Sequence, residues 1–402
     1  MLNWKKQVWL LWCCQLISIA AMEMSEPFWP LFLRQLRPET VNITVWSAII
    51  YGAPLLVSGL VAPYWGKLGD RYGHKKMVLR ASLGLAITQG LLFFCTELWE
   101  VLALRLLQGA LAGIITAVLC FANSITPTEK RSAVIGKLTS ATAAGAILGP
   151  VIGGVLIQWL SFSALFATAS MACLLIALVL AAGLKQPPLS ASGEQKKKHR
   201  PDSVPSLNTQ LIGLGLLVIF LLQTAKALPS SFFALYAESY LEITPFMTGL
   251  LFSSAGIGMM LSAPLWGSYF DKLQQASKPL VLAFITAIAG LCYFLHLQTD
   301  WLLLLLVRLV WGLCLGAMLP MIQALMITFA EESRQGLLIG RAQRNIKIGN
   351  LAGVSSGALL LVWWDYQTGF TVAAAVYLLA ASVLMMVWSL LNRSYEPVPA
   401  ER

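Results

Sequence analysis

Charged residues are scarce in this sequence: only 11% of its 402 residues are Asp, Glu, Lys or Arg, and only 18 are acidic. An ordinary soluble domain carries about twice that share, so the chain has too little charge to cover a water-facing surface. Histidine occurs three times, and neither a His-Glu-x-x-His motif nor a phosphate-binding loop is present. These absences argue against a zinc peptidase and an ATP-driven machine, and we expect no enzymatic activity.

The seven cysteines have neither the spacing of metal ligands nor that of a disulfide framework. All of them fall inside apolar stretches: Cys13, Cys14, Cys95, Cys120, Cys173, Cys292 and Cys314. We therefore expect no metal site, no cofactor and no disulfide scaffold.

Apolar residues, by contrast, are abundant, at 58% of the chain with 14 tryptophans. Runs of roughly 20 apolar residues are long enough to cross a bilayer core about 30 Å thick, and the sequence contains twelve of them. They lie near residues 8–33, 43–64, 78–96, 99–122, 134–158, 162–184, 209–234, 244–265, 280–298, 301–324, 340–362 and 367–391. The pattern predicts an all-α membrane protein.

The basic residues indicate how these spans are oriented. If both termini are cytoplasmic, only Arg34 and Arg37 of the 28 Lys and Arg lie outside, and Arg105, Lys226 and Arg308 lie within spans. This distribution follows the positive-inside rule, so the net charge of +10 reflects topology and not nucleic-acid binding. The first apolar run is too long for a signal peptide, and we expect a retained span of a bacterial inner-membrane protein.

The spans form two sets of six, separated by a polar stretch. Residues 185–207 contain a basic run and four prolines and are predicted to form a cytoplasmic linker between an N-terminal half, 1–184, and a C-terminal half, 208–402. Sequence echoes support an internal repeat: APYWG at 62–66 returns as APLWG at 263–267, 201 residues later. Arg105 and its Leu-x-x-Gly-x-x-x-Gly continuation return at Arg308, 203 residues later, and Ile135-Gly136-Lys137 returns 204 residues later as Ile339-Gly340-Arg341. Such repeats place a substrate site at the interface of the halves.

The segment 66–76 carries the residues by which the chain resembles a known family. It reads GKLGDRYGHKK, which is similar to the signature loop between helices two and three of the major facilitator superfamily. The glycines allow a tight turn, the basic run suits the anionic inner leaflet, and Asp70 supplies a carboxylate for a latch between the halves. We expect its partner at the start of the eleventh span, where Arg341, Arg344 and a helix N-terminus favour an anion. The second-half copy keeps Gly267 and Asp271 but lacks the basic continuation.

Two further motifs resemble those of the twelve-helix drug:proton antiporters. Residues 104–109, LRLLQG, are similar to the helix-four motif of proton-coupled members, whose Arg is implied to influence proton transfer. Residues 145–154, GAILGPVIGG, match the helix-five antiporter motif, in which glycines permit close helix packing and the proline bends the span. The residues expected to act in gating are Gly66, Asp70, Arg71, Gly149, Pro150, Asp271, Arg341 and Arg344.

Intramembrane charge is the feature particular to this chain. Helix one carries Glu23 and Glu26 on one face, before two prolines, and two carboxylates this close in lipid should not both be ionised. In the seventh span Lys226 lies near the pseudo-symmetric position of Glu23, so a pair across a central cavity is reasonable. Alternatively, Glu26 reaches the periplasmic surface. The proposed proton or substrate residues are Glu23, Glu26, Arg105, Gln108, Lys226 and Arg308.

Together these features predict a monomeric secondary transporter that exports a small molecule or drug in exchange for protons. The cationic balance of the intramembrane charges leaves a second transporter class open, a carrier of a carboxylate-rich metallophore such as a siderophore, or of an organic anion, in either direction. A membrane receptor is less consistent with the sequence, because no long polar segment offers a signalling domain.

Overall fold

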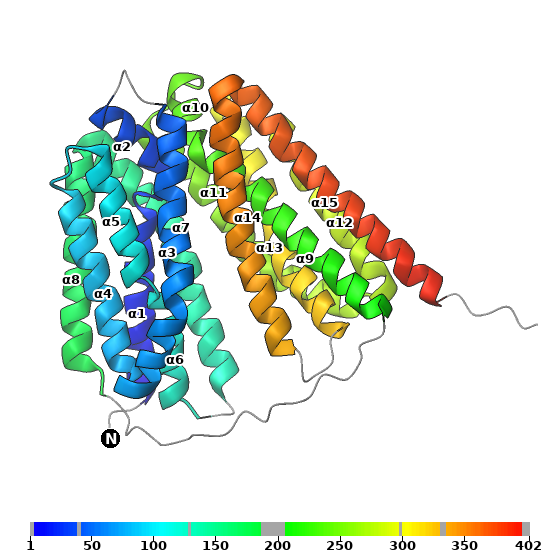
Figure 1. The fold of residues 1–402 in the computed structure, drawn as a ribbon, viewed down its shortest axis with the longest axis horizontal. Helices are drawn as coiled ribbons and strands as arrows, with labels where there is room; N and C mark the ends of the chain where they lie inside the picture. Colours follow the sequence, from blue (N-terminus) through cyan, green and yellow to red (C-terminus); the bar gives the residue numbers. More distant parts are fainter. Residues whose placement is uncertain are drawn as a thin grey trace, which may run out of the picture. The chain divides into compact units, whose positions relative to one another are not determined.

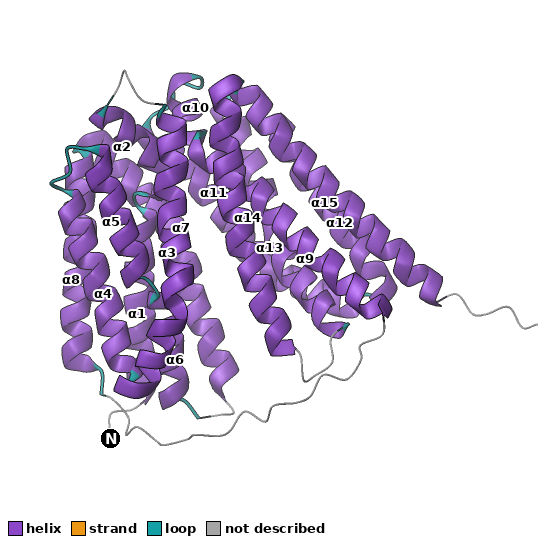
Figure 2. Cartoon of the chain, viewed as in Figure 1, coloured by secondary structure: helices purple, strands orange, loops and turns teal. Residues whose placement is uncertain are grey.

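The computed structural model describes residues 4–37, 42–127, 130–185, 206–296, 300–329 and 335–395, and every regular element in these ranges is a helix (Figure 1 and Figure 2). The elements are α1 (Trp4–Glu23), η1 (Glu26–Phe28), α2 (Trp29–Leu36), α3 (Ile43–Tyr72), α4 (His74–Leu92), α5 (Leu98–Leu111), α6 (Ile114–Ile125), α7 (Arg131–Trp159), α8 (Phe162–Gly183), α9 (Ser206–Ala227), η3 (Leu228–Ser231), α10 (Phe233–Ser239), α11 (Pro245–Lys272), η4 (Gln275–Ser277), α12 (Lys278–Leu295), α13 (Trp301–Thr328), α14 (Gln335–Trp363) and α15 (Tyr366–Tyr395).

Each of the twelve predicted spans corresponds to a helix or to a broken helix, which confirms the expected all-α fold. Within the described residues, eleven helical segments are long and apolar enough to cross a membrane. The twelfth is α4, which carries Lys75, Lys76 and Arg80 in its first two turns and is therefore too charged to stand out by hydropathy.

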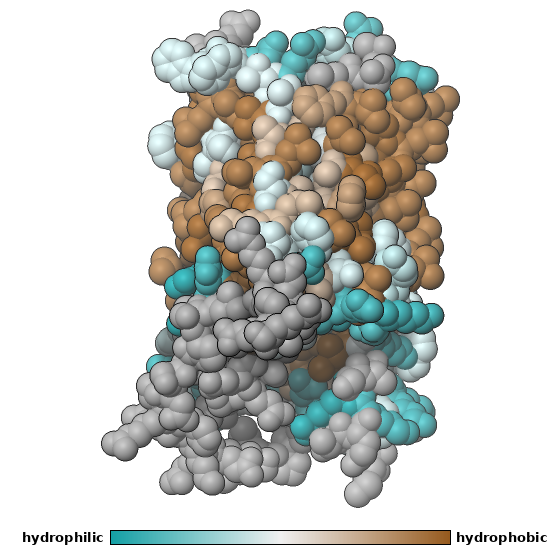
Figure 3. Space-filling model, turned by 90° about the vertical axis from the view of Figure 1, so that its right-hand side faces the viewer, coloured by the Kyte–Doolittle hydropathy of each residue, from teal (hydrophilic) through white to brown (hydrophobic). Residues whose placement is uncertain are grey.

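Large apolar side chains point outward from these helices. Phe284, Leu306 and Trp363 are 63%, 57% and 78% exposed, which would be costly in water but suits contact with lipid chains. On the face drawn in Figure 3, apolar residues cover a broad belt and hydrophilic residues gather at its two ends. This distribution is typical of a membrane-spanning protein.

The first span is broken at its two carboxylates. Because Pro27 and Pro30 have no N–H, the carbonyls of Glu23 and Glu26 lack their usual α-helical donors four residues on. The chain responds by ending α1 at Glu23, turning, and continuing through η1 into α2. The seventh span breaks similarly, since α9 ends at Ala227 and η3 contains Pro229. Both breaks therefore leave helix ends next to ionisable residues.

The fourth span is broken as well, between α5 and α6. Gly113 there has φ of 113°, a conformation that glycine adopts without strain. Arg80 of α4 donates from Nη2 to the freed carbonyl of Ala112, 2.9 Å away, and its guanidinium lies 3.8 Å from the ring centre of Trp65. In the second half Gly316, the repeat of Gly113, lies inside the unbroken helix α13.

By the density of their internal contacts, the helices fall into two compact units, Met1–Glu194 with Phe232–Ser253, and Gln195–Ser231 with Ser254–Arg402. In the first unit α1 packs on α7, α4 on α8 and α3 on α5, and in the second α9 packs on α14 and α12 on α15. Most of the predicted linker, from residue 186 to 205, lies outside the described residues, and the division into halves at 185–207 stays a prediction.

The repeat seen in the sequence reappears in the way two helix pairs pack. A Cβ added at Gly145 of α7 would lie 2.8 Å from the carbonyl oxygen of Leu16 on α1, and a Cβ added at Gly149 would lie 2.8 Å from the carbonyl oxygen of Ala20. A Cβ added at Gly153 would overlap the carbonyl oxygen of Met24, the residue after α1. In the second unit Gly349, Gly353 and Gly357 of α14 meet the carbonyls of Phe220, Thr224 and Leu228 in the same way, each residue 204 positions after its counterpart. Close backbone approach at small residues is how membrane helices associate.

Candidate functional site

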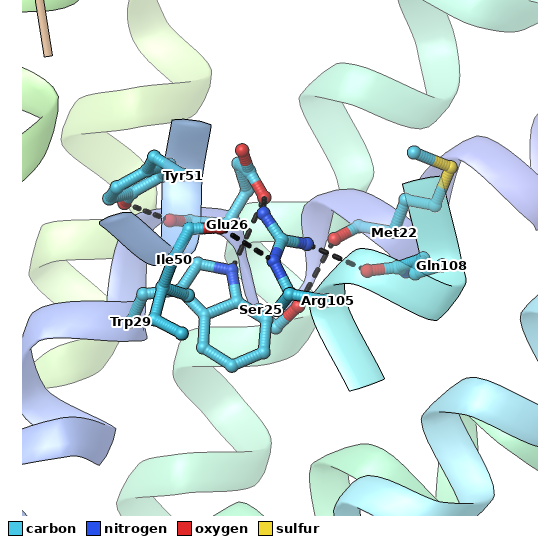
Figure 4. A network of polar contacts seen from close by, with 8 residues as sticks. All are labelled: Met22, Ser25, Glu26, Trp29, Ile50, Tyr51, Arg105 and Gln108. Atoms are coloured by element: carbon cyan, nitrogen blue, oxygen red, sulfur yellow. Dashed lines mark hydrogen bonds and ion pairs between the residues drawn. The ribbon is translucent and has the colours of Figure 1, made fainter. Parts of the chain in front are cut away.

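The first unit contains a polar cluster centred on Arg105 of α5 (Figure 4). The guanidinium is buried, with only 6% of the side chain exposed, and every contact that it makes is with a polar or aromatic group. Its Nε donates to the carbonyl of Ile50 at 3.0 Å, and its Nη1 donates to Oε1 of Gln108 at 2.8 Å. The cation also lies 4.6 Å from the ring centre of Trp29. An Arg inside a membrane helix is costly, and these contacts offset that cost.

Glu26 is the carboxylate of this cluster. Its Oε2 lies 3.6 Å from Nη2 of Arg105 and accepts a hydrogen bond of 3.3 Å from Nε1 of Trp29. Its main-chain carbonyl, which Pro30 leaves without a helical donor, accepts a hydrogen bond from the hydroxyl of Tyr51. The Glu26 side chain is 40% exposed, so one side of the carboxylate is held by the cluster while the other is accessible.

Glu23 lies one turn before Glu26 in a different environment. It is the last residue of α1. A Cβ added at Gly149 would lie only 2.5 Å from the Cβ of Glu23. The antiporter motif of α7 thus leaves room for this carboxylate. The C-terminal end of a helix disfavours a negative charge, whereas Glu26 stands beside a guanidinium and in the first turn of η1. The two carboxylates therefore have different immediate neighbours, while the charge of Arg105 acts on both.

The paired glycines at the end of the antiporter motif face two different helices. Gly153 faces Met24, the residue that follows α1. Its neighbour Gly154 faces the start of α11, and a Cβ added at Gly154 would lie 2.5 Å from the carbonyl oxygen of Pro245. Successive residues of a helix point about 100° apart, so two adjacent glycines let two neighbours approach α7 at one level. Gly249 of α11 in turn faces the carbonyl of Pro150.

Pro150 interrupts the hydrogen bonding of α7 at this contact. The hydroxyl of Ser253 donates to the carbonyl of Ile147 at 2.5 Å, so α11 supplies a donor close to the proline. We expect Pro150→Ala to lower the exchange rate about tenfold, equivalent to about 1.4 kcal/mol in the barrier, because the restored N–H straightens a helix that must bend. Exchange of substrate in liposomes, set against the yield of monodisperse protein, checks this; wild-type exchange would contradict a hinge at Pro150.

The second unit holds the other two predicted intramembrane cations. Lys226 is exposed in the last turn of α9, where a helix C-terminus favours a positive charge. Arg308 of α13 is 6% exposed, and its guanidinium lies 5.5 Å from the ring centre of Trp311. Because Lys226 and Glu23 belong to different units, the pairing of these two residues across a central cavity stays a prediction.

The signature loop is resolved in part. The backbone of α3 runs through Gly66 and Arg71, and the guanidinium of Arg71 lies 5.3 Å from the ring centre of Tyr72. The side chain of Asp70 lies outside the described part of the chain. Asp271, Arg341 and Arg344 are exposed on the second unit, and the latch between them and the loop stays a prediction.

Lys75, a basic residue of the signature loop at 66–76, has a partner that the sequence did not indicate. Lys75 donates from Nζ to the last carbonyls of α8, at 2.9 Å to Ala181 and 2.5 Å to Leu184. It therefore caps a helix C-terminus, besides any contact with lipid headgroups.

Trp29 and Tyr51 are the site residues that sequence reasoning missed. Their ring types are common in membrane helices, so neither stands out in one sequence. A signal was present nonetheless: a carbonyl freed by Pro30 requires a donor in a low-dielectric setting, and a tyrosine can provide one. No group of three or more His, Cys, Asp or Glu that could hold a metal occurs in the described residues.

Known proteins are similar to this chain over nearly its whole length. The family model described as Major Facilitator Superfamily matches residues 11–221 and 215–402. Staphyloferrin B transporter of Staphylococcus aureus is 30% identical over 96% of this chain and 93% of that protein. Multidrug resistance protein MdtG of Citrobacter koseri is 29% identical over 100% of this chain and 98% of that protein. A bacterial homologue of the human lysosomal transporter Spinster, solved in an inward-facing and unoccupied conformation, shares the fold with a TM-score of 0.77, at 11% identity and 100% coverage of both chains.

Proposed function

Given that the chain belongs to the major facilitator superfamily and is therefore a multi-pass membrane transporter and not an enzyme, we propose that it exports a small molecule in exchange for protons. We further propose that it works as a monomer in the bacterial inner membrane with both termini in the cytoplasm. The family expected from the loop at 66–76 and from the helix-five motif is confirmed.

The observation that carries proton coupling is the pair of unlike carboxylates at the break of helix one. Glu26 lies beside Arg105 and accepts a hydrogen bond from the indole N–H of Trp29, whereas Glu23 is the last residue of α1, at the negative end of the helix dipole. Two acids whose environments differ in this way can divide their roles. We assign proton carriage to Glu23 and assign to Glu26 the role of a fixed counter-charge for Arg105.

The packing of α7 supports the coupling of that proton to movement. Gly149 contacts Glu23, and Pro150 and Gly154 contact α11 five residues or fewer away on the same helix. A change of charge at Glu23 therefore acts directly on the helix that carries the antiporter motif. This is a short physical connection between proton binding and a bent, glycine-rich element.

Two substrate classes fit, as the relatives' names illustrate: MdtG is a multidrug resistance protein and the staphylococcal relative is a staphyloferrin B transporter. Among the predicted intramembrane residues, the three cations Arg105, Lys226 and Arg308 outnumber the two carboxylates Glu23 and Glu26, which gives a cationic balance. That balance favours a carboxylate-rich substrate, such as a citrate-type metallophore, over a lipophilic cation.

Substitution of Lys226 should separate the two classes. Lys226→Ala removes a cation from the predicted substrate region, so binding of a carboxylate ligand should weaken about tenfold, whereas a lipophilic cation should bind equally well or better. Equilibrium binding of one ligand of each class to purified protein checks this. Equal effects on both ligands would contradict a role for Lys226 in substrate recognition.

The test of the function itself is transport by purified protein in liposomes. With an imposed pH gradient, a set of cationic dyes and of carboxylate ligands should include at least one that is moved against its own gradient. Collapse of the pH gradient by an ionophore should stop that movement. Concentrative transport that survives the ionophore would refute proton coupling.

A further inference from the structure

Trp29 makes two contacts with the same ion pair, and each uses a different part of its ring. The indole N–H donates to Oε2 of Glu26 at 3.3 Å, while the ring face lies 4.6 Å from the guanidinium of Arg105. The edge of the ring thus holds the anion and the face holds the cation (Figure 4).

The indole is itself fixed from the other side. Trp29 is 1% exposed, and its ring centre lies 5.8 Å from that of Phe166 on α8 and 6.1 Å from that of Phe32. Neither Phe offers a polar group, so these contacts set the position of the ring and leave its N–H directed to Glu26. A rigid ring of this kind can fix a carboxylate without occupying the carboxylate's accessible side.

We infer that Trp29 is a positioning residue of the proton site, which holds the Glu26 carboxylate beside Arg105 so that Glu23 alone exchanges the proton. This role rests on the proposed function. It differs from a purely structural role because it depends on a single N–H group and not on the volume of the ring.

The charged and titratable groups around Glu26 come from several elements. Arg105 comes from α5, Tyr51 from α3 and Glu23 from α1. The short helix α10, which also packs on η1, carries Tyr236 and Glu238, and Glu238 forms an ion pair with Arg34 of α2. Arg105 lies beside the Glu26 carboxylate and Tyr51 bonds the Glu26 main-chain carbonyl, so loss of the Trp29 N–H removes a direct hydrogen bond to the carboxylate.

The test uses Trp29→Phe, which keeps an aromatic ring beside Arg105 and removes the N–H. A hydrogen bond to a carboxylate stabilises its ionised form, so without it Glu26 takes up a proton at higher pH. If transport requires the Glu26 to Arg105 pair, the acid limb of the transport rate against pH should move upward by about one unit. The matched control is Trp65→Phe, which removes an indole N–H that donates to the carbonyl of Ala110 on the same helix α5. The control should not move the acid limb.

A second measurement does not depend on transport. Infrared difference spectra of purified Glu23→Gln protein should show the carboxyl band of Glu26 growing at higher pH when Trp29→Phe is added, and Glu26→Gln should remove that band. If Trp29→Phe does not fold, Trp29→Met, which also has no side-chain donor, serves in its place. An unshifted acid limb and an unshifted band would overturn the role of Trp29 and leave the proposed function intact. An acid limb that Glu26→Gln itself does not change would instead refute the assignment of Glu26 within the proposed function.

Discussion

Glu23→Gln is expected to abolish transport driven by a pH gradient, lowering the rate to that of empty liposomes. Gln resembles the protonated acid in shape and hydrogen bonding, so the variant should stay in the protonated form of the cycle. Substrate binding should persist, and counterflow, which needs no net proton movement, should continue. The measurement is uptake into liposomes with and without an imposed gradient, together with counterflow of labelled substrate.

This pattern separates a defect in coupling from a defect in folding, because an unfolded variant would lose counterflow too. Full gradient-driven transport by Glu23→Gln, with Glu26 unchanged, would place the coupling site elsewhere, and Glu26 would then be the first candidate. In that case the accessible side of the Glu26 carboxylate, and not the end of α1, would be where the proton enters.

Gly153→Ala is expected to destabilise the protein strongly. The added Cβ would overlap the carbonyl oxygen of Met24, and neither backbone can move without shifting α1 against α7. Overpacking of this kind costs about 3 kcal/mol, and more when only backbone can yield. Thermal unfolding of the purified protein in detergent, and the yield of folded protein in membranes, measure the loss.

A control on the same helix is available. A Cβ added at Gly136 meets nothing within 4 Å, and alanine is a better helix former than glycine by about 0.5 to 1 kcal/mol. Gly136→Ala should therefore leave stability unchanged or raise it. Equal destabilisation by the two substitutions would show that the contact with Met24 does not determine the effect.

Much of the fold follows from the sequence, because hydrophobic length and charge asymmetry report directly on the membrane. The glycine spacing of the helix-five motif predicted close packing, and the structure identifies α1 as the helix that approaches. The sequence also indicated that Arg105 requires polar partners, since a charge in lipid must be compensated.

What could not be predicted was the identity of those partners and the position of one helix break. Trp29 and Tyr51 approach Glu26 only because α2 and α3 fold beside η1, and no spacing along the chain encodes that contact. The break before α6 was missed because Gly113 and Gly316 occupy the same place in the repeated motif, yet only the first ends a helix. The difference lies in Arg80, a side chain from another helix that binds the freed carbonyl.

The adjacent glycines 153 and 154, which face two different helices, limit how this transporter can vary. Every other amino acid carries a Cβ, so no missense mutation at either codon avoids a collision with a neighbouring backbone. Variants selected for altered transport should therefore leave both codons intact. In a library of random mutants grown under selection, positions 153 and 154 should tolerate no substitution, whereas position 136 of the same helix should vary freely.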